Sequence, residues 1–264
     1  MRVAEIGDNC IDLYERLNRK YPTGNVVDTG VNLKKLGIDV SIISTTGSDE
    51  NGKWMIDSLK KEGLDISHLK VAEGQTAITY MDMIDNDRVH GDYVEGVLAD
   101  MVFDDEDIEF AAGHDLVHTA LWGMAEDAIE KIAKKGTPVA FDYADRLDHE
   151  LVEKTLPYVT YGFYSYHNGR DEFIESFLKD KVNRGMKIAV ATFGEQGSLA
   201  YDKEGFHVGN IVKAKQVVNT VGAGDSFIAG FIYGILNKCS VEECLHKGAE
   251  VASSVVEVFE PWVL

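Results

Sequence analysis

The sequence predicts an α/β protein with a mostly parallel central sheet that is covered by helices on both faces. Short apolar runs alternate along the chain with amphipathic helical stretches, which is typical of successive βαβ units. The 264 residues carry no internal repeat, no low-complexity tract and only four prolines. A single domain over residues 1–264 is therefore expected, large enough for one sizeable core.

The elements follow from these two kinds of pattern. Strands are expected where short apolar runs occur, at 2–7, 38–43, 115–118, 137–141, 159–164 and 187–193. Helices are expected where apolar residues recur at helical spacing, at 25–36, 49–62, 126–135, 171–184, 225–237 and 241–258. Two stretches, 10–21 and 76–94, read instead as extended chain without an intervening helix. In such a sheet, ligands bind beyond the carboxyl ends of the strands.

The most informative motif is Gly222-Ala223-Gly224-Asp225, which directly precedes the apolar run of helix 225–237. Two glycines separated by a small residue can turn several N–H groups toward one point at a helix start, where partial positive charge collects. A carboxylate there could accept a proton from an alcohol while the amides hold the charge on a transferred phosphoryl group. The alternative is a simple helix N-cap by Asp225. A dinucleotide fingerprint is disfavoured because Phe227 occupies the place of its third small residue.

The motif resembles the C-terminal signature of the ribokinase, or PfkB, family of carbohydrate kinases. Segments 7–12, 47–52 and 192–197 resemble the family's first strand, its Gly-x-Asp-x-x-Gly turn and its nucleotide loop, in the expected order. The resemblance implies a ribokinase-like fold in which segments 10–21 and 76–94 form a small β-sheet lid over the sugar. Because this lid is often shared between subunits, a homodimer through the lid is expected.

The resemblance and the residues agree on the catalytic assignment. Asp225 is expected to be the catalytic base, and the amides of Gly222, Ala223 and Gly224 the anion hole. Phosphoryl transfer depends mainly on positioning and charge stabilisation, so loss of this base should reduce the rate by about 10²–10⁴-fold.

The sugar site is implied by the family's first-strand aspartate and its Gly-Gly-x-x-x-Asn segment, which fall here on Asp12, Gly24, Asn25 and Asp28. Two departures occur, because Thr23 replaces the first glycine and Asp28 replaces the asparagine. An amide that can donate thus becomes an acceptor-only carboxylate, which suggests a cationic substituent nearby. The alternative is that Asp28 caps a helix.

Segments 6–9, 86–93, 95–100 and 122–127 resemble the branch of the family that acts on fructoselysine. A fructosamine carries positive amines, which Asp92, Glu95, Glu126 or Asp127 could pair with. The alternative for Glu126 and Asp127 is that they complement a helix dipole.

For the nucleotide, Thr192, Gly194 and Gly197 match the family's loop and are expected near the phosphates or ribose of ATP; the alternative is a plain hairpin turn. Magnesium is expected with ATP, but the residues that position it stay unassigned. Asn168 begins the nearest approach to the family's Asn-x-x-Glu motif, with Asp171 in place of the glutamate. Asn219 stands where many relatives carry Asp near a monovalent-cation site, which leaves potassium activation an open question.

Two further patterns are decoys. Gly47–Gly52 followed by Lys53 and Trp54 is close to a phosphate-binding P-loop, but tryptophan replaces the hydroxyl that would contact magnesium. His114 and His118 are four residues apart, yet they fall in a strand-like segment, where a zinc pair is disfavoured.

Composition restricts the function further. The net charge of −19 argues against nucleic acid as a partner, because phosphate backbones require clustered Lys and Arg. No window approaches eighteen uninterrupted apolar residues, and strand 2–7 begins at once, so no membrane association and a cytoplasmic location are expected.

The sequence therefore predicts an ATP-dependent, magnesium-requiring kinase for a primary hydroxyl of a ketose derivative, with fructoselysine as the preferred substrate. One alternative is another small-sugar or nucleoside kinase of the same fold, for which Tyr14, Tyr21, Tyr80 and Tyr93 offer aromatic platforms. Another is a non-catalytic sugar-binding regulator.

Overall fold

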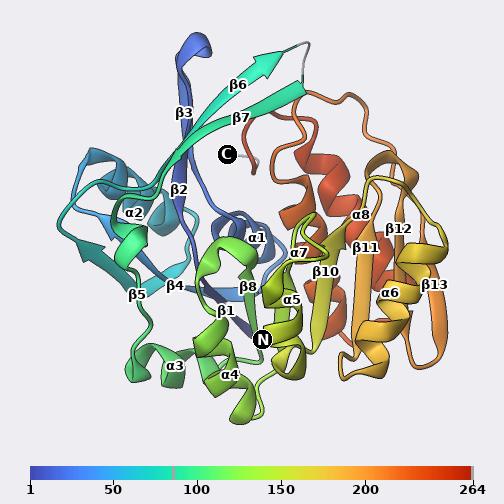
Figure 1. Cartoon of the computed structure of the whole chain (residues 1–264). Coiled ribbons are helices and arrows are strands. Elements are labelled where there is room, and N and C mark those ends of the chain that lie inside the picture. Colours follow the sequence, from blue (N-terminus) through green and yellow to red (C-terminus); the bar gives the residue numbers. More distant parts are fainter. Residues whose placement is uncertain (85–86, 263–264) are drawn as a thin grey trace.

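The computed structural model describes residues 1–84 and 87–262. Residues 85 and 86 of the expected lid segment 76–94, and residue 86 of the segment 86–93, lie outside it. The chain forms a nine-stranded sheet in the order β13-β12-β11-β10-β9-β8-β1-β4-β5 and a separate four-stranded sheet in the order β3-β2-β6-β7 (Figure 1). Strands from β5 through β11 are parallel, whereas β12 and β13 add an antiparallel edge. The predicted α/β class with a small β-sheet lid is confirmed.

The strands of the large sheet are β1 (Arg2–Ile6), β4 (Asp39–Gly47), β5 (Asp65–Ala72), β8 (Leu116–Ala120), β9 (Val139–Asp142), β10 (Tyr161–Ser165), β11 (Ile188–Thr192), β12 (Ser198–Asp202) and β13 (Gly205–Gly209). The helices are α1 (Asn25–Lys35), α2 (Glu50–Lys61), α3 (Asp105–Ala112), α4 (Glu126–Lys134), α5 (Glu150–Thr155), α6 (Glu172–Asn183), α7 (Ala223–Leu236) and α8 (Val241–Val255). All twelve elements predicted for the body are present. Strands β5, β12 and β13 and helices α3 and α5 were not predicted.

Two apolar clusters sandwich the sheet because neighbouring residues of each strand face opposite sides. In β1, Val3 packs toward α1, α2, α7 and α8, while Ala4 and Ile6 pack toward α3, α4, α5 and α6. Glu5 follows the alternation and therefore points to the same side as Val3, although its side chain is charged.

The lid consists of β2 (Cys10–Tyr14), β3 (Arg19–Thr23), β6 (Ile78–Ile84) and β7 (Asp87–Val94), which extend beyond the body in Figure 1. The lid is fixed to the C-terminal tail by Tyr14 and Tyr21, which are buried with Met81 and Val221 against Phe259. The ring of Phe259 meets those of both tyrosines edge-on. These two tyrosines join the lid to the C-terminal tail, so they are not available as the nucleoside platforms considered from sequence.

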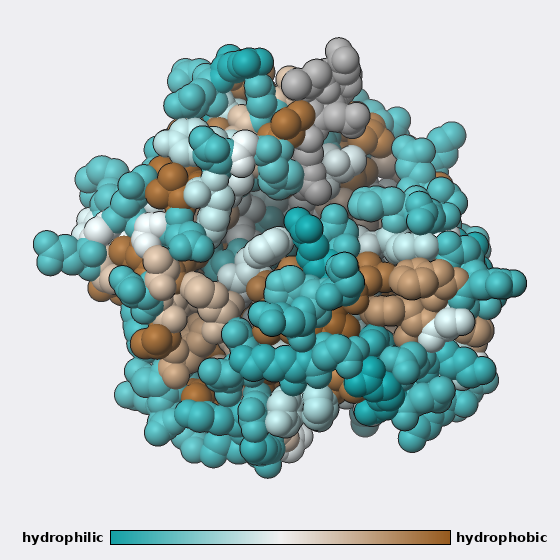
Figure 2. Space-filling model, in the orientation of Figure 1, coloured by the Kyte–Doolittle hydropathy of each residue, from teal (hydrophilic) through white to brown (hydrophobic). Residues whose placement is uncertain are grey.

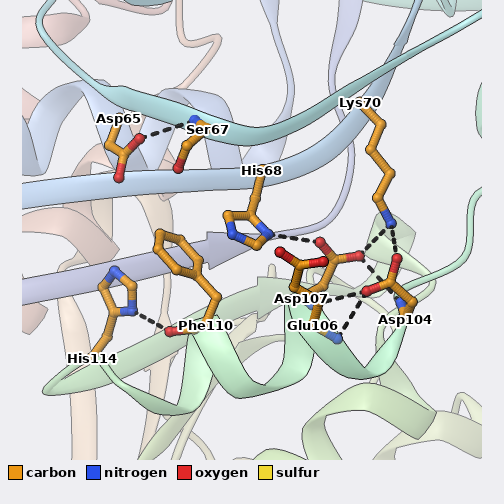
Figure 3. A network of polar contacts seen from close by, with 9 residues as sticks. All are labelled: Asp65, Ser67, His68, Lys70, Asp104, Glu106, Asp107, Phe110 and His114. Carbon is orange, nitrogen blue, oxygen red and sulfur yellow. Dashed lines mark hydrogen bonds and ion pairs between the residues drawn. The ribbon is translucent and has the colours of Figure 1, made fainter.

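The β5 edge of the nine-stranded sheet is held by a polar cluster between β5 and α3 (Figure 3). Lys70 binds Asp104 and Asp107 at 2.8 and 2.5 Å, and the Nδ1 atom of His68 lies 2.9 Å from Asp107. The His68 ring also stacks on Phe110 with centroids 3.9 Å apart. Asp104 caps α3 by accepting from the N–H groups of Glu106 and Asp107. We call His68, Lys70, Asp104 and Asp107 the edge cluster.

The face of the molecule in Figure 2 is mainly hydrophilic, and its apolar patches are separated by polar side chains. This distribution agrees with a net charge of −19. Within the described ranges, no helix is long and apolar enough to cross a membrane.

Candidate active site

The turn before α7 has a geometry that requires glycine at position 222. Gly222 is the N-cap at φ 72°, and a Cβ atom there would lie 2.9 Å from Pro261, so only glycine fits. The amide of Ala223 donates to the carbonyl of Thr220 at 3.3 Å, which removes it from the expected anion hole. The amides of Gly224 and Asp225 follow in the first helical turn, where no preceding helical carbonyl can accept from them. A Cβ at Gly224 would meet no atom within 4 Å among the described residues, so open space lies over this turn.

Asp225 projects from this first turn and is half-buried. Its Oδ1 atom accepts a hydrogen bond from the side-chain amide of Asn25 at 2.9 Å. Burial, followed by the negative charge of Asp142, raises the pKa of Asp225 to about 7, while Asn25 and His118 act in the opposite direction. A carboxylate whose pKa lies near neutrality is suited to general-base catalysis.

Asn25 links Asp225 to a second carboxylate. Its backbone N–H donates to Asp8 Oδ2 at 3.1 Å, while its side chain reaches Asp225. Gly24 makes this approach possible, because a Cβ there would lie 2.8 Å from the Asp8 carbonyl oxygen. Asp8 Oδ1 is buried without a hydrogen-bond partner among the residues described. Asp8 was not assigned to the site from the sequence, although it lies two residues after the end of β1.

Asp28 is also buried beside the site. Its Oδ2 atom accepts from the Thr23 hydroxyl at 2.8 Å, and burial and the charge of Asp225 raise its pKa well above the usual range. The alternative that Asp28 caps a helix is wrong, because α1 begins at Asn25 with Gly24 as its N-cap. Asp28 lies one turn inside the helix, where its N–H donates to the carbonyl of Gly24 at 2.8 Å.

The lid contributes a row of side chains to the same region. Asp12, Thr79 and Tyr93 are direct neighbours across β2, β6 and β7, so they share one face of the lid sheet. Cys10, two residues before Asp12, lies with its Sγ atom 3.6 Å from the Thr79 hydroxyl. Burial and the neighbouring Cys10 and Asp8 raise the pKa of the half-exposed Tyr93.

The acidic residues expected to bind an amine occupy less enclosed positions. Asp92 and Glu95 are exposed, on β7 and just after it. Glu126 is half-buried and lies with Asp127 in the first turn of α4, as the helix-dipole alternative expects. Lys154 contacts both residues, at 3.6 and 3.0 Å. The charge of Glu126 is therefore partly offset by this lysine.

The candidate nucleotide loop joins β11 to β12. Thr192 ends β11, Gly194–Gln196 form one turn, and Gly197 at φ 89° leads into the antiparallel strand, so the segment is a hairpin as the alternative supposed. A Cβ at Gly197 would collide with the carbonyl oxygen of Gly209, whereas space is open within 4 Å of Gly194. A Cβ at Gly169 would collide with Gln196, so the loop that contains Asn168 lies beside this hairpin.

The residues considered for metals have other partners. Asn168 donates to the Tyr166 hydroxyl at 3.2 Å, and both oxygens of Asp171 are used, by the Ile174 amide and the Tyr166 hydroxyl. His114 contacts Ser41 and the Phe110 carbonyl. Across the described residues, no group of three or more His, Cys, Asp or Glu is arranged to hold a metal ion.

Asp49, within the P-loop-like segment Gly47–Gly52, and Asn219 have structural roles. Asp49 caps α2 by accepting from the Gly52 amide at 2.9 Å, so the P-loop-like segment is a helix start, as predicted. Asn219 donates to the carbonyl of Phe259 at 2.8 Å and accepts from the Val221 amide at 3.1 Å. Asn219 therefore ties the C-terminal tail to the turn that precedes α7.

Sequence analysis missed a buried ion pair behind the site. Glu5 Oε2 lies 2.6 Å from His118 Nδ1, and neither side chain is exposed. The only local signal was a charged residue within the apolar run 2–7 and a histidine within strand 115–118. Nothing in either segment alone indicates that β1 and β8 are adjacent.

Comparison with known proteins agrees with this geometry. A family model described as "pfkB family carbohydrate kinase" matches residues 14–261. The chain is 37% identical to fructoselysine 6-kinase of Escherichia coli K12 over 260 residues, which cover 98% of this chain and 99% of that one. It is 28% identical to fructosamine kinase FrlD of Bacillus subtilis, covering 98% of this chain and 92% of the relative.

Solved structures share the fold. The nucleoside kinase of Methanocaldococcus jannaschii superposes with a TM-score of 0.78 at 25% identity, covering 97% of this chain and 92% of that one. The ribokinase of Arabidopsis thaliana, solved with ribose and ATP, gives a TM-score of 0.82 at 20% identity, with coverage of 97% and 92%.

Proposed function

The chain belongs to the pfkB family of carbohydrate kinases, and from that premise we propose that it transfers the γ-phosphoryl group of ATP to the 6-hydroxyl of fructoselysine. The general activity, phosphoryl transfer to an alcohol, follows from family membership. The choice of fructoselysine is supported by the two fructosamine-directed relatives, which match 98% of this chain.

The observation that carries the proposal is the position of Asp225. Its carboxylate is half-buried at the start of α7, beside a turn with open space over Gly224. We infer that Asp225 takes the proton of the 6-hydroxyl while the oxygen bonds to the γ-phosphorus and the bond to ADP breaks. The amides of the first turn of α7 would stabilise the charge on the transferred group.

Recognition of the sugar is assigned to the polar side chains that gather around Asp225. Asp12 is buried on β2 of the lid, and Asn25 and Asp28 lie on α1. Asp8 adds a buried oxygen without a partner among the described residues. Such a concentration of carboxylates suits a substrate that carries hydroxyl donors and a positive amine. We assign Glu95 and Glu126 to the amine end, with Asp92 as a further candidate.

Magnesium is proposed to enter with ATP and to be held chiefly by phosphate oxygens, where it would neutralise their charge. Thr192, Gly194 and Gly197 are assigned to the nucleotide side, supported by the open space at Gly194. Asn168 remains a weaker candidate because its amide donates to Tyr166. Asn219 already joins two backbone groups through its amide, so we expect no requirement for potassium.

We further propose a homodimer formed through the lid. Strands β3 and β7 are the free edges of the lid sheet, and Leu17, Val89 and Val94 are exposed on it. Unpaired edges with apolar side chains favour association with a second chain. Light scattering would detect a dimer, and a charged substitution at Val94 should shift it to monomer.

The function is tested by measuring ADP release with fructoselysine, other fructosamines, fructose, ribose and nucleosides. Fructoselysine should give the highest kcat/KM. A higher value with a nucleoside would favour the alternative of a nucleoside kinase, and absence of turnover with every compound, despite sugar binding, would favour a regulator.

A further inference from the structure

The buried pair of Glu5 and His118 lies inside the large sheet, on the adjacent strands β1 and β8. Glu5 of β1 and His118 of β8 are neighbours in register. His118 is in turn a neighbour of Ala140 on β9, and Asp142 lies two residues beyond Ala140, on the same face. This is the face covered by α1 and α7, the helices that carry Asn25 and Asp225.

Packing does not account for the pair. Both side chains are fully buried and joined by one bond of 2.6 Å. Glu5 Oε1 and His118 Nε2 have no hydrogen-bond partner within residues 1–84 and 87–262. Removing two charges from water costs several kcal/mol per ion, and well-packed apolar residues in such places are often equally or more stable. The pair is therefore better explained by an effect on its surroundings than by stability.

The charges around the imidazole come from four elements. They are Glu5 on β1, Asp142 on β9, Asp225 on α7, and Asp8 in the turn after β1. Burial disfavours a positive ring, but the charge and hydrogen bond of Glu5 prevail, and the pKa of His118 is raised. The ring in turn favours the ionised forms of Asp8, Asp142 and Asp225. Glu5 on β1 and Asp142 on β9 come from the two strands that flank His118, so the ring lies between acidic groups in the sheet.

We propose that His118, anchored as a cation by Glu5, is a positioning residue that keeps Asp225 ionised and available as the catalytic base. Several carboxylates lie together behind and around the sugar, and each one makes ionisation of the next more costly. One buried cation offsets this repulsion without entering the substrate pocket. This inference rests on the proposed role of Asp225.

The test is the pH dependence of kcat/KM in His118→Gln, with His114→Gln as the matched control. His114 lies four residues earlier, is also buried, and bonds to Ser41 and Phe110 rather than to the site. Loss of a nearby opposite charge raises the pKa of a carboxyl group. The acid limb of His118→Gln should therefore move to higher pH, with lower activity at pH 7 that recovers at pH 9. His114→Gln should keep the wild-type profile.

A merely structural role would give another pattern. In that case His118→Gln would lose the same factor at every pH, or lose none, and either result would overturn the proposal. If His118→Gln does not fold, Glu5→Gln provides a second variant, because it removes the anchor of the cation. Its acid limb should move in the same direction, and an unmoved limb would contradict the proposal.

A measurement without substrate separates this inference from the proposed reaction. In ¹⁵N-labelled wild-type protein at pH 7, the ring nitrogens of His118 should both carry protons, and Glu5→Gln should reduce that protonation. A neutral ring in the wild type would end the proposal even if the kinase reaction is confirmed. A protonated ring in a protein that phosphorylates no sugar would instead contradict the proposed function.

Discussion

Two histidine–carboxylate groups in this molecule differ in how completely they are paired. In the edge cluster, Asp107 accepts from His68 at one oxygen and from Lys70 and the Asp104 amide at the other (Figure 3). In the central pair, Glu5 and His118 each keep one buried polar atom without a partner in the described part of the chain. The difference indicates that the first group fastens an edge strand, whereas the second maintains an electrostatic condition at the active site.

The pKa shifts in the two regions have opposite signs. The hydrogen bond from Lys70 lowers the pKa of Asp104 to about 2, so this carboxylate is more stable when ionised. Burial and Asp142 raise the pKa of Asp225 to about 7. At neutral pH the lowered pKa of Asp104 therefore contributes to the free energy of unfolding, whereas the raised pKa of Asp225, the proposed base, reduces it.

The largest effect is expected from Asp225→Asn, which should reduce kcat by about 10²–10⁴-fold because the base is removed.

The same change should stabilise the protein at pH 8. Between about pH 4 and pH 7, Asp225 is protonated in the folded protein but ionised in the unfolded chain. The free energy of unfolding of the wild type therefore falls as the pH rises through this window, by up to about 4 kcal/mol in total. Urea unfolding at pH 4 and pH 8 measures this, and equal stability of both proteins at pH 8 would contradict it.

Lowering the pH from 8 to 5 should reduce wild-type kcat/KM by about a hundredfold, since only the ionised form of Asp225 accepts a proton. The fold should persist, because the contribution of Asp104 to stability is present above about pH 4 and is lost only as the pH falls toward 2. Circular dichroism recorded alongside the rates checks this. Unfolding that coincides with the loss of activity would show that the acid limb does not report Asp225.

Asp107→Ala should reduce the free energy of unfolding by about 1–3 kcal/mol, because it removes a buried acceptor from His68 and Lys70. The kcat value should stay at the wild-type level, since the edge cluster lies on β5 and α3 rather than at the site. Denaturant titration measures the free energy of unfolding, and steady-state kinetics measure kcat. A loss of activity without a loss of stability would make the edge cluster functional.

Glu126→Gln should raise KM for fructoselysine about fivefold and leave KM for fructose unchanged, if its charge binds an amine. Asp127→Asn is the matched control, since Asp127 also contacts Lys154 but its side chain is exposed, whereas that of Glu126 is half-buried; an equal effect of Asp127→Asn would assign amine binding to both acids. An equal change with both sugars would remove Glu126 from amine recognition.

The smallest effect is expected from replacing potassium with sodium, which should leave kcat unchanged because the Asn219 amide already bridges Val221 and Phe259. Asn219→Asp removes the donor to Phe259 and should introduce a dependence on the cation. Strong potassium activation of the wild-type enzyme would show that the amide does not replace a cation.

The sequence predicts correctly those features that depend only on residues close together in the chain. The parallel strands and their helices have strong periodic patterns, and the turn around Gly222 combines backbone freedom and a carboxylate within four residues. The edge strands β5 and β13 were missed because partly exposed strands lack a continuous apolar run, and β12 was missed because only its first three residues are buried. Asp8 and the Glu5–His118 pair depend on which strands become neighbours, and that is set by the whole sheet rather than by any one segment.

The most direct test of the central claim is to identify the product that the wild-type protein forms from fructoselysine and ATP. Nuclear magnetic resonance should show phosphorus coupled to carbon 6, with one ADP formed for each sugar phosphate. Hydrolysis of ATP without a sugar phosphate, or phosphate on another oxygen, would contradict the proposed function.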